Sequence, residues 1–465
     1  MSSEKHHFLR DLGVYGYDHV EPVILAALVT GDPLLLIGKA GTGKTFLLNS
    51  LSEALGLEHR HYNASLIAFD DLVGFPYPEK DGEGIRYLET PATVWQAQSV
   101  LIDEISRCKP EHQNRLFSLV HERRIQGIGL PNLRYRWAAM NPSSTDQGVD
   151  DFYEGSVPLD QALSDRFAFV TEVPDWDELE ESDRKLVADP AGEGALSEDG
   201  GKLAKFIEES TKALGRAQAA HRKNVIDYAA AAATALGQNR VRISPRRARQ
   251  LARNLLGLTA VNEGRVTSDL YRLGLENSLP HRAWGVAPKG ETIRAAHKLA
   301  WDHAFLSGGE QWLNGVLLES RLDAKIAKIL KESPDEDTGA IAVSRILAAA
   351  GPVDQAILAF SLYPAALEGH AKIGAEGIAT LSNTAHSILD VNGEVSWQER
   401  LTESRTNHPD LAECARVLSK KRGGRKERAS QFFSYLVANG ISVGNPELIE
   451  KELNRCILKV RSITK

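Results

Sequence analysis

Eight consecutive residues near the start of the chain have the types and spacing needed to enclose a phosphate group. Residues 38–45 read Gly-Lys-Ala-Gly-Thr-Gly-Lys-Thr, which fits the pattern G-x-x-x-x-G-K-[ST] in full. The glycines let the backbone wrap around an anion with its N–H groups pointing inward. Lys44 can then reach the β- and γ-phosphates of ATP, and the Thr45 hydroxyl can ligate Mg²⁺. The segment predicts an ATP site formed by Gly38, Lys39, Ala40, Gly41, Thr42, Gly43, Lys44, Thr45 and the adjoining Phe46.

The position of this segment supports the same interpretation. An apolar run, Leu34 to Ile37, directly precedes it and is typical of a buried strand, while Phe46 to Leu57 has the pattern of a helix. A helix that begins at the loop adds a partial positive charge next to the phosphate. A glycine-rich turn that matched by chance would not be expected between a strand and a helix.

Two acids and an amide follow later apolar runs and could supply hydrolytic chemistry. Asp103 and Glu104 end the run 100–104, so Asp103 can hold Mg²⁺ through water and Glu104 can polarise the attacking water. Asn141 ends the run 135–141, and its amide could touch the γ-phosphate because strand ends of a parallel sheet face the ligand crevice. The alternative for Asn141 is a turn-forming residue before Pro142.

Two arginines are candidates for contacts with the transferring phosphoryl group. Arg166 lies just before a strand-like run and could act across a subunit boundary. The alternative is a surface salt bridge with Asp165. Further on, Ser244 suits a helix N-cap and is followed by proline, which would aim Arg246 back at the nucleotide from a lid, with Arg247 the less favoured choice.

The elements expected around these residues form a parallel sheet covered by helices. Across 1–175, short apolar runs alternate with helical stretches, which is typical of an α/β core with helices on both faces. The expected strands cover 34–37, 59–62, 100–103, 135–141 and 167–173.

The rest of the chain has a helical pattern. We expect a nucleotide-binding core at 1–175, a helical lid at 176–289 that carries Arg246, and a mainly helical partner-binding or targeting region at 290–465. The acidic, glycine-rich stretch 189–202 is interpreted as a solvated insertion. In the last region the expected helices cover 291–306, 312–330, 339–350 and 353–367.

Composition excludes several classes of protein. Hydrophobic residues make up 42% of the chain and the net charge is −7, which gives no general attraction to nucleic acid or to an anionic membrane. Three cysteines without a C-x-x-C pair argue against a disulfide framework or a structural zinc site. There is no signal-peptide pattern and no run of roughly 18–20 apolar residues, so we expect a soluble, cytoplasmic protein without membrane insertion.

The order of these motifs resembles that of an AAA+ ATPase, and within that class the MoxR branch. Asp103 to Arg107 is similar to the D-E-I-N-R segment of that branch, and 113–124 is similar to the helix that follows it. Residues 154–167 resemble its E-G-T-x-x-L-P-E-A-Q-L-D-R-F segment. Ser244-Pro245-Arg246 matches its S-P-R, and His281-Arg282 falls where the branch has an H-R pair.

This resemblance implies an architecture and a set of partners. The fold would be a P-loop AAA+ αβα core with a five-stranded sheet and a helical lid, assembled as a homo-hexamer with ATP at the subunit interfaces. A hairpin insertion is expected at 84–89, and Val14, Tyr15 and Gly16 would border the adenine. MoxR-like proteins resemble chaperones that work with a von Willebrand A domain protein. Ser106 and Lys39-Ala40 depart from the usual residues of the branch, without affecting a residue of direct chemical role.

Three uses of ATP remain open from the sequence. The first is a ring that remodels or activates a protein partner. The second is a nucleic-acid-stimulated motor or loader, supported by the basic stretch 420–428, which is followed by Phe432, Phe433 and Tyr435. That stretch could equally be a solvated loop before a helix that packs in the core. The third is an ATP-gated assembly scaffold with slow turnover.

Overall fold

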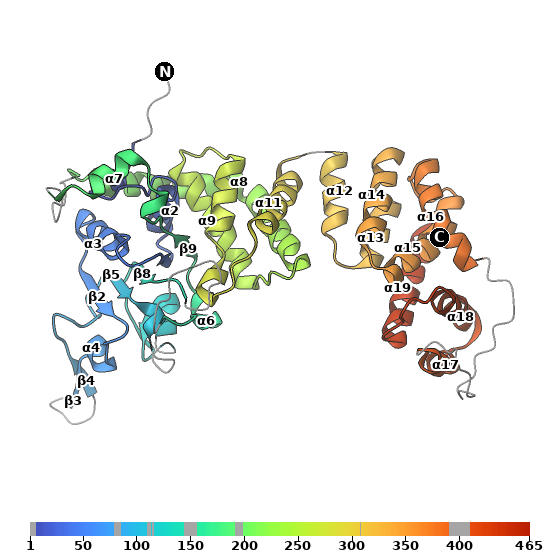
Figure 1. Ribbon diagram of the computed structural model, residues 1–465, viewed down its shortest axis with the longest axis horizontal. Coiled ribbons are helices and arrows are strands. Elements are labelled where there is room, and N and C mark those ends of the chain that lie inside the picture. Colours follow the sequence, from blue (N-terminus) through green and yellow to red (C-terminus); the bar gives the residue numbers. More distant parts are fainter. Residues whose placement is uncertain are drawn as a thin grey trace, which may run out of the picture. The chain divides into compact units, whose positions relative to one another are not determined.

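The computed structural model describes residues 6–78, 85–108, 113, 116–143, 156–190, 199–306, 308–389 and 410–465. The chain packs as two compact units, residues 1–300 and 301–465, and many of their elements are labelled in Figure 1. The expected boundary between core and lid at residue 175 lies inside the first unit, and the three-part division of the chain stays a prediction.

A five-stranded parallel sheet forms the centre of the first unit. Its strands lie in the order β2-β5-β8-β1-β9, and every pairing between neighbours is parallel. The apolar runs form central strands because both faces are covered, and all of β1 and β8 is buried. The strands are β1 (Leu34–Ile37), β2 (His59–Asn63), β5 (Ser99–Asp103), β8 (Tyr135–Met140) and β9 (Phe169–Glu172). The five strands expected from the sequence are therefore confirmed, within a few residues at their ends.

Short elements connect these strands. Two helices lie beside the first strand in sequence, α2 (Glu21–Thr30) and α3 (Lys44–Ala54). The hairpin expected at 84–89 is present, with β3 (Phe75–Pro78) antiparallel to β4 (Ile85–Leu88), while Gly84 lies outside the described residues. A second hairpin joins β6 (Arg124–Ile125) to β7 (Ile128–Gly129). The remaining short elements are α1 (Phe8–Asp11), α4 (Phe69–Val73), η1 (Ile105–Arg107), η2 (Ser118–Glu122), α6 (Gln161–Ser164) and η3 (Trp176–Glu178).

The second half of this unit is helical, as expected for 176–289. Its long helix α8 packs against α9, and α9 also packs against α2 of the core. Gly257 allows that second contact, because a Cβ atom there would lie 2.7 Å from Thr30 Cγ2. The insertion at 189–202 lies partly outside the described residues, since 191–198 are among those not described. The elements are α7 (Glu181–Val187), α8 (Lys202–Gln238), α9 (Pro245–Val261), α10 (Ser268–Glu276), η5 (Pro280–Trp284) and α11 (Gly290–Phe305).

The second unit is helical throughout its described residues, which confirms the expected fold class for this region. Its core gathers around α15, whose side chains are mostly buried. In the described residues of the chain, no helix is long and apolar enough to cross a membrane. The helices are α12 (Gly309–Leu318), α13 (Leu322–Glu332), α14 (Glu336–Ala349), α15 (Pro352–Leu367), α16 (Gly374–Leu389), α17 (Leu411–Ser419), α18 (Gly423–Ala438) and α19 (Pro446–Thr464).

The basic stretch 420–428 differs from the loop that the sequence allowed. Helix α18 begins at Gly423, so most of the stretch is helical, and Phe432 and Phe433 further along α18 are buried in the core as expected. Glu450 of α19 is 1% exposed and forms ion pairs with Lys421 at 2.9 Å and with Arg425 at 2.6 Å. These ion pairs to a buried carboxylate hold the start of α18 against α19.

Candidate functional site

The phosphate-binding segment lies between β1 and α3, as the sequence predicts. Gly41 and Gly43 have φ angles of 82° and 83°, in the left-handed region that glycine adopts without strain. Gly38 is required for a different reason, because a Cβ atom there would lie 2.3 Å from Val173 Cγ2. The segment therefore has the backbone freedom needed to turn N–H groups toward one point, at the start of an eleven-residue helix.

Lys44 is enclosed at the centre of this loop. Its side chain donates hydrogen bonds from Nζ to the carbonyl oxygens of Gly38 and Lys39, both at 2.7 Å, and to Asn141 Oδ1 at 3.3 Å. The residue is 8% exposed, and none of the described residues forms an ion pair with it. Burial lowers the pKa of the Lys44 ammonium, while the nearby carboxylates of Glu104 and Asp103 act in the opposite direction. The result is a nearly buried positive charge held mainly by neutral oxygens.

Thr45 and Asp103 meet beside Lys44. The Thr45 hydroxyl donates to Asp103 Oδ2 at 2.9 Å, and the ring nitrogen Nε2 of His61 lies 3.4 Å from the same oxygen. Although burial acts to raise it, the pKa of Asp103 is lowered by hydrogen bonds from His61, Thr45 and the Glu104 N–H. The two residues expected to bind Mg²⁺ are therefore in contact, with the carboxylate held in its ionised form.

Glu104 follows with an unusual backbone conformation. Its φ angle is 54°, in the left-handed region, so the chain turns sharply after β5. Its carboxylate forms an ion pair with Arg107 Nε at 3.1 Å and accepts a hydrogen bond from Asn141 Nδ2 at 3.4 Å. Asn141 therefore bridges Lys44 and Glu104, which brings together the residues that sequence placed at three separate strand ends.

The segment expected to border adenine is tied to the phosphate loop. Val14 is buried, and Tyr15 and Gly16 are half-buried. The next residue, Tyr17, is buried and donates its hydroxyl hydrogen to the Thr42 carbonyl oxygen at 2.7 Å. A Cβ atom at Gly16 would lie 2.1 Å from a Leu179 methyl group, so the segment packs closely against the residues after β9.

Arg166 has surroundings that sequence did not predict. Its guanidinium lies 4.4 Å from the centre of the Phe117 ring, a cation–π arrangement, and donates to the Ala162 carbonyl oxygen. The salt bridge with Asp165 that was its alternative role is absent from the described residues, because Asp165 pairs with α9 instead. The pKa of the Arg166 guanidinium is lowered, mainly by burial and next by the positive charge of Arg246. The two arginines thus lie close enough for their charges to interact.

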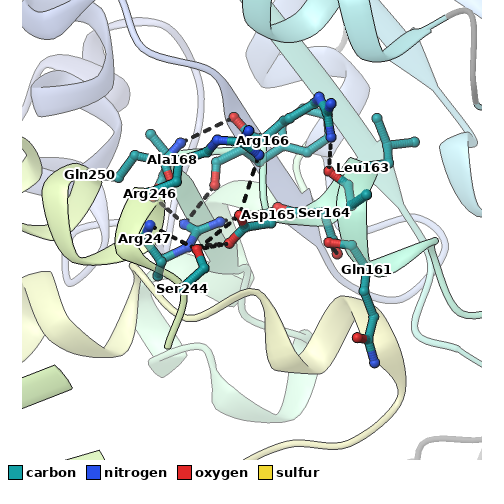
Figure 2. A network of polar contacts seen from close by, with 12 residues as sticks. Gln161, Leu163, Ser164, Asp165, Arg166, Ala168, Ser244, Arg246, Arg247 and Gln250 are labelled. Carbon is teal, nitrogen blue, oxygen red and sulfur yellow. Dashed lines mark hydrogen bonds and ion pairs between the residues drawn. The ribbon is translucent and has the colours of Figure 1, made fainter. Parts of the chain in front are cut away.

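The two arginines at the start of α9 have different surroundings (Figure 2). Arg247 is 1% exposed and donates to Asp165 and to four backbone carbonyl oxygens, those of Ser164, Phe167, Ala168 and Ser278. Arg246 is more exposed and approaches Asp165 Oδ2 at 3.5 Å. Ser244 accepts a hydrogen bond from the Arg247 N–H, so the expected N-cap is present. Arg247 anchors the helix, and Arg246 is left accessible beside Arg166.

Several residues of the site carry no motif that sequence reasoning could use. Three of them contact predicted site residues: His61, Arg107 and Tyr17. A fourth, Asp175, lies after β9 and forms an ion pair with Lys39 of the phosphate loop at 3.1 Å. Arg107 had one usable signal, since it lies three residues after Glu104 and ends the D-E-I-N-R-like segment. The others reach the site from strands or loops distant in sequence.

Comparison with known proteins identifies an AAA domain. Residues 33–167 match the family described as AAA domain (dynein-related subfamily). This stretch begins just before β1, contains the phosphate loop, Asp103, Glu104 and Asn141, and ends just after Arg166. The match establishes the AAA+ type of fold for the core, without separating the MoxR branch from other branches.

Related proteins are similar over part of their length. An uncharacterized protein of Bacillus subtilis (strain 168) is 29% identical over 168 residues, a match that covers 34% of this chain and 55% of that protein. A structural protein of Acidianus two-tailed virus is 27% identical over 174 residues, covering 35% and 27% of the two chains. The chain thus spans about half the length, or less, of these relatives. Among solved structures, a candidate ATPase of Cytophaga hutchinsonii aligns with a TM-score of 0.44 and 18% identity, over 63% of this chain and 91% of that one.

Proposed function

We propose that this chain is a MoxR-like AAA+ ATPase, which binds ATP with Mg²⁺ and hydrolyses it in a homo-hexameric ring to remodel a protein partner. The observation that carries the proposal is the state of Lys44. A nearly buried ammonium without an ion pair in the described structure is costly unless an anion neutralises it. The β- and γ-phosphates of ATP would supply that charge, within a loop whose backbone suits them.

The residues beside Lys44 suit a magnesium nucleotide. A hydroxyl and a carboxylate, from Thr45 and Asp103, are oxygen ligands of the kind that Mg²⁺ prefers, and they already lie 2.9 Å apart. When bound with ATP, Mg²⁺ neutralises charge on the phosphate oxygens. Thr45 would ligate the ion and Asp103 would hold it through water, in keeping with the waters that magnesium usually retains at nucleotide sites.

Glu104 is the proposed general base. Its carboxylate is held by Arg107 and Asn141, next to Lys44 and Asp103, and it would orient and polarise a water molecule for attack on the γ-phosphate. Asn141, which contacts both Lys44 and Glu104, would position that water relative to the phosphate.

Arg166 is proposed to stabilise charge at a neighbouring subunit's nucleotide, and Arg246 is proposed to contact a nucleotide from the lid. Arg166 follows Asp165 in the sequence, and Arg246 approaches the Asp165 carboxylate. In the described structure, no hydrogen bond or ion pair joins either arginine to the phosphate loop. Two accessible guanidinium groups in one place suit a transferring phosphoryl group, which carries its charge on several oxygens. This arrangement supports a shared site between subunits, with Arg246 acting beside Arg166.

The substitution Glu104→Gln tests the hydrolytic assignment. The amide cannot accept a proton, so the rate of ATP hydrolysis should fall by at least about 100-fold while ATP binding is retained. Phosphate release and the affinity for a fluorescent ATP analogue would be measured together. Glu53→Gln, on the exposed side of α3, makes the same chemical change outside the site and should leave both values unaltered. Unchanged hydrolysis by Glu104→Gln would show that another residue activates the water.

The same variant tests the proposed partner. With ATP bound and hydrolysis blocked, the ring of Glu104→Gln subunits should stay bound to the protein that it engages. We expect a von Willebrand A domain protein to be recovered with it. The three cysteines of the chain are buried and form no disulfide within the described residues, which suits such an assembly in the reducing cytoplasm. Stimulation of ATP hydrolysis by added DNA or RNA, weakening with salt, would favour the motor or loader instead. Assembly with slow turnover and no partner would favour the scaffold.

A further inference from the structure

A groove in the second compact unit is lined mainly by positive side chains from three segments. Arg321 precedes α13, Arg425 lies in the first turn of α18, and Lys451, Arg455 and Lys459 belong to α19. The cavity measures about 470 Å³, and α19 packs against both α13 and α18. The three cations of α19 are four residues apart, which places them on one side of the helix at steps of about 6 Å.

Buried carboxylates hold several of these cations in place. Asp323 is buried and forms ion pairs with Arg321 at 2.8 Å and with Arg455 at 3.5 Å. Glu450, also buried, does the same for Arg425. The acids are inaccessible, whereas the guanidinium groups that they orient are partly exposed. Arg455 and Lys451 also form ion pairs with Glu452 and Glu447, which are not buried. Arg321 and Arg425 therefore present positive charge whose acidic partners lie below the surface.

The surrounding sequence carries a large excess of positive charge. Residues 420–465 contain eleven Lys and Arg against four Glu, a net charge of +7, although the chain as a whole carries −7. Lys459, Arg428 and Arg461 form no ion pair with any described residue of the chain. Burial, and next the charge of Arg461, lower the pKa of the Arg428 guanidinium, as expected where cations crowd together. A bound polyanion would relieve this repulsion.

We propose that this groove binds duplex DNA through its phosphate backbone. The described lining offers cations together with the hydrogen-bonding side chains of Asn454 and Ser462, which are residue types that contact phosphates and sugars. Leu458 is its sole apolar member, and none of the described lining residues is aromatic. A protein interface would need an apolar or aromatic centre, and single-stranded nucleic acid would need aromatic rings for stacking.

The proposed contacts predict steep salt dependence without sequence preference. Each phosphate contact in B-DNA adds about 0.9 to the slope of log K against log salt. If the five lining cations each contact one phosphate, the slope should approach about −4.5. The proposed contacts are with phosphates and sugars, which carry no sequence information. Duplexes of different sequence should therefore bind with similar affinity.

The test uses the full-length protein and a fluorescent DNA duplex of about two helical turns. The double variant Lys451→Gln/Lys459→Gln removes two lining cations that are not paired with buried acids. It should reduce the magnitude of the salt slope by about 2 and weaken binding by about tenfold. The control Arg345→Gln/Lys372→Gln makes the same charge change at exposed positions outside the groove and should match wild type.

Other results would overturn the proposal. An equal loss of DNA affinity in both double variants would show that binding depends on the net charge of the protein and not on the groove. Tighter binding of a single strand, or equal competition by polyglutamate, would assign the groove to a different polyanion. Lys451→Arg/Lys459→Arg should retain both affinity and salt slope, since it retains the charges. ATP hydrolysis would be measured in parallel, and it should be unchanged in every variant because the substituted residues lie in the second unit.

Discussion

At the scale of single residues, Glu104 shows how the site is held ready for its proposed role. A left-handed φ angle in a residue other than glycine costs of the order of 1–3 kcal/mol, and such strain persists where surrounding contacts require it. Here Arg107 and Asn141 both contact the carboxylate. The carboxylate that follows the strained turn after β5 is therefore held beside Asn141, which also contacts Lys44.

Arg107 is accordingly expected to act as a positioning residue. In Arg107→Gln the ion pair to Glu104 is lost, so the carboxylate should sample more orientations, and kcat for ATP hydrolysis should fall about tenfold. KM for ATP should change little, because Arg107 does not contact the phosphate loop. Steady-state kinetics would separate the two values.

Arg124→Gln provides the control for this prediction, since Arg124 is an exposed arginine on β6 with no ion pair among the described residues. Equal kcat values for the two variants would show that Glu104 does not depend on Arg107. A matching loss of thermal stability and of kcat in Arg107→Gln would indicate a structural role instead.

The residues of the site are predictable where a local sequence pattern marks them, as at the phosphate loop and at the strand ends. The spacing of the phosphate loop alone implies a phosphate site, and Asp103 and Glu104 gain their meaning from following a strand downstream of that loop. His61 and Tyr17 were not predictable, since β2 and the segment after α1 meet the site through the tertiary fold. A histidine in a strand or a tyrosine in a loop carries no local signal of such contacts.

At the scale of elements, the position of α9 depends on one buried side chain. Arg247 joins the first turn of α9 to the segment from Ser164 to Ala168 (Figure 2). It also donates to the Ser278 carbonyl oxygen. Arg166 lies in that segment and Arg246 at the start of α9. One anchor thus fixes both accessible arginines relative to each other.

Loss of this anchor should destabilise the first unit. Arg247→Met would remove a donor from four carbonyl oxygens. Those of Ala168 and Ser164 keep Asn254 and the Phe167 N–H as donors, and we expect a loss of about 3 kcal/mol in the free energy of unfolding. Urea unfolding of the full-length protein would measure it. Arg249→Met, at an exposed position of the same helix, should change stability by less than about 0.5 kcal/mol. Similar values for the two variants would contradict the anchoring role.

The helical pattern of the sequence predicts the location of helices more accurately than their ends. The stretch 312–330 reads as one helix, yet the structure has α12 and α13 with a break at Glu319 to Arg321. Neither glycine nor proline marks the break. Glu319 adopts an extended conformation, and its side chain accepts hydrogen bonds from the N–H groups of Ser320 and Arg321, a local preference that hydrophobic spacing does not report.

At the scale of the whole molecule, the two compact units differ in fold, and the second gathers positive charge in one segment. The sheet, the phosphate loop and Arg166 belong to residues 1–300, whereas the positive groove belongs to 301–465. The composition of the full chain conceals this difference, because a net charge of −7 masks the +7 of residues 420–465. Net charge therefore excluded nucleic acid as a general partner but could not exclude a local site for it.

The strongest prediction at this scale concerns the ring. If Arg166 acts on the nucleotide of a neighbouring subunit, Arg166→Ala should lower hydrolysis by about 10³-fold or more, and Glu104→Gln should also be inactive alone. In an equal mixture, an Arg166→Ala subunit retains Glu104 and can receive Arg166 from a Glu104→Gln neighbour. Random assembly places such a pair at about a quarter of the interfaces, so about a quarter of wild-type activity should return.

The control for this mixture is a subunit that carries both substitutions. Mixed with Glu104→Gln, the double variant cannot create an interface with both residues intact, since neither subunit then supplies Glu104. It should show no recovery, even though the rings assemble from the same surfaces. If the first mixture also stays inactive while mass measurements confirm mixed rings, Arg166 must serve the nucleotide of its own subunit, and the shared site is wrong. Recovery in the first mixture alone would place Glu104 and Arg166 on opposite sides of one interface.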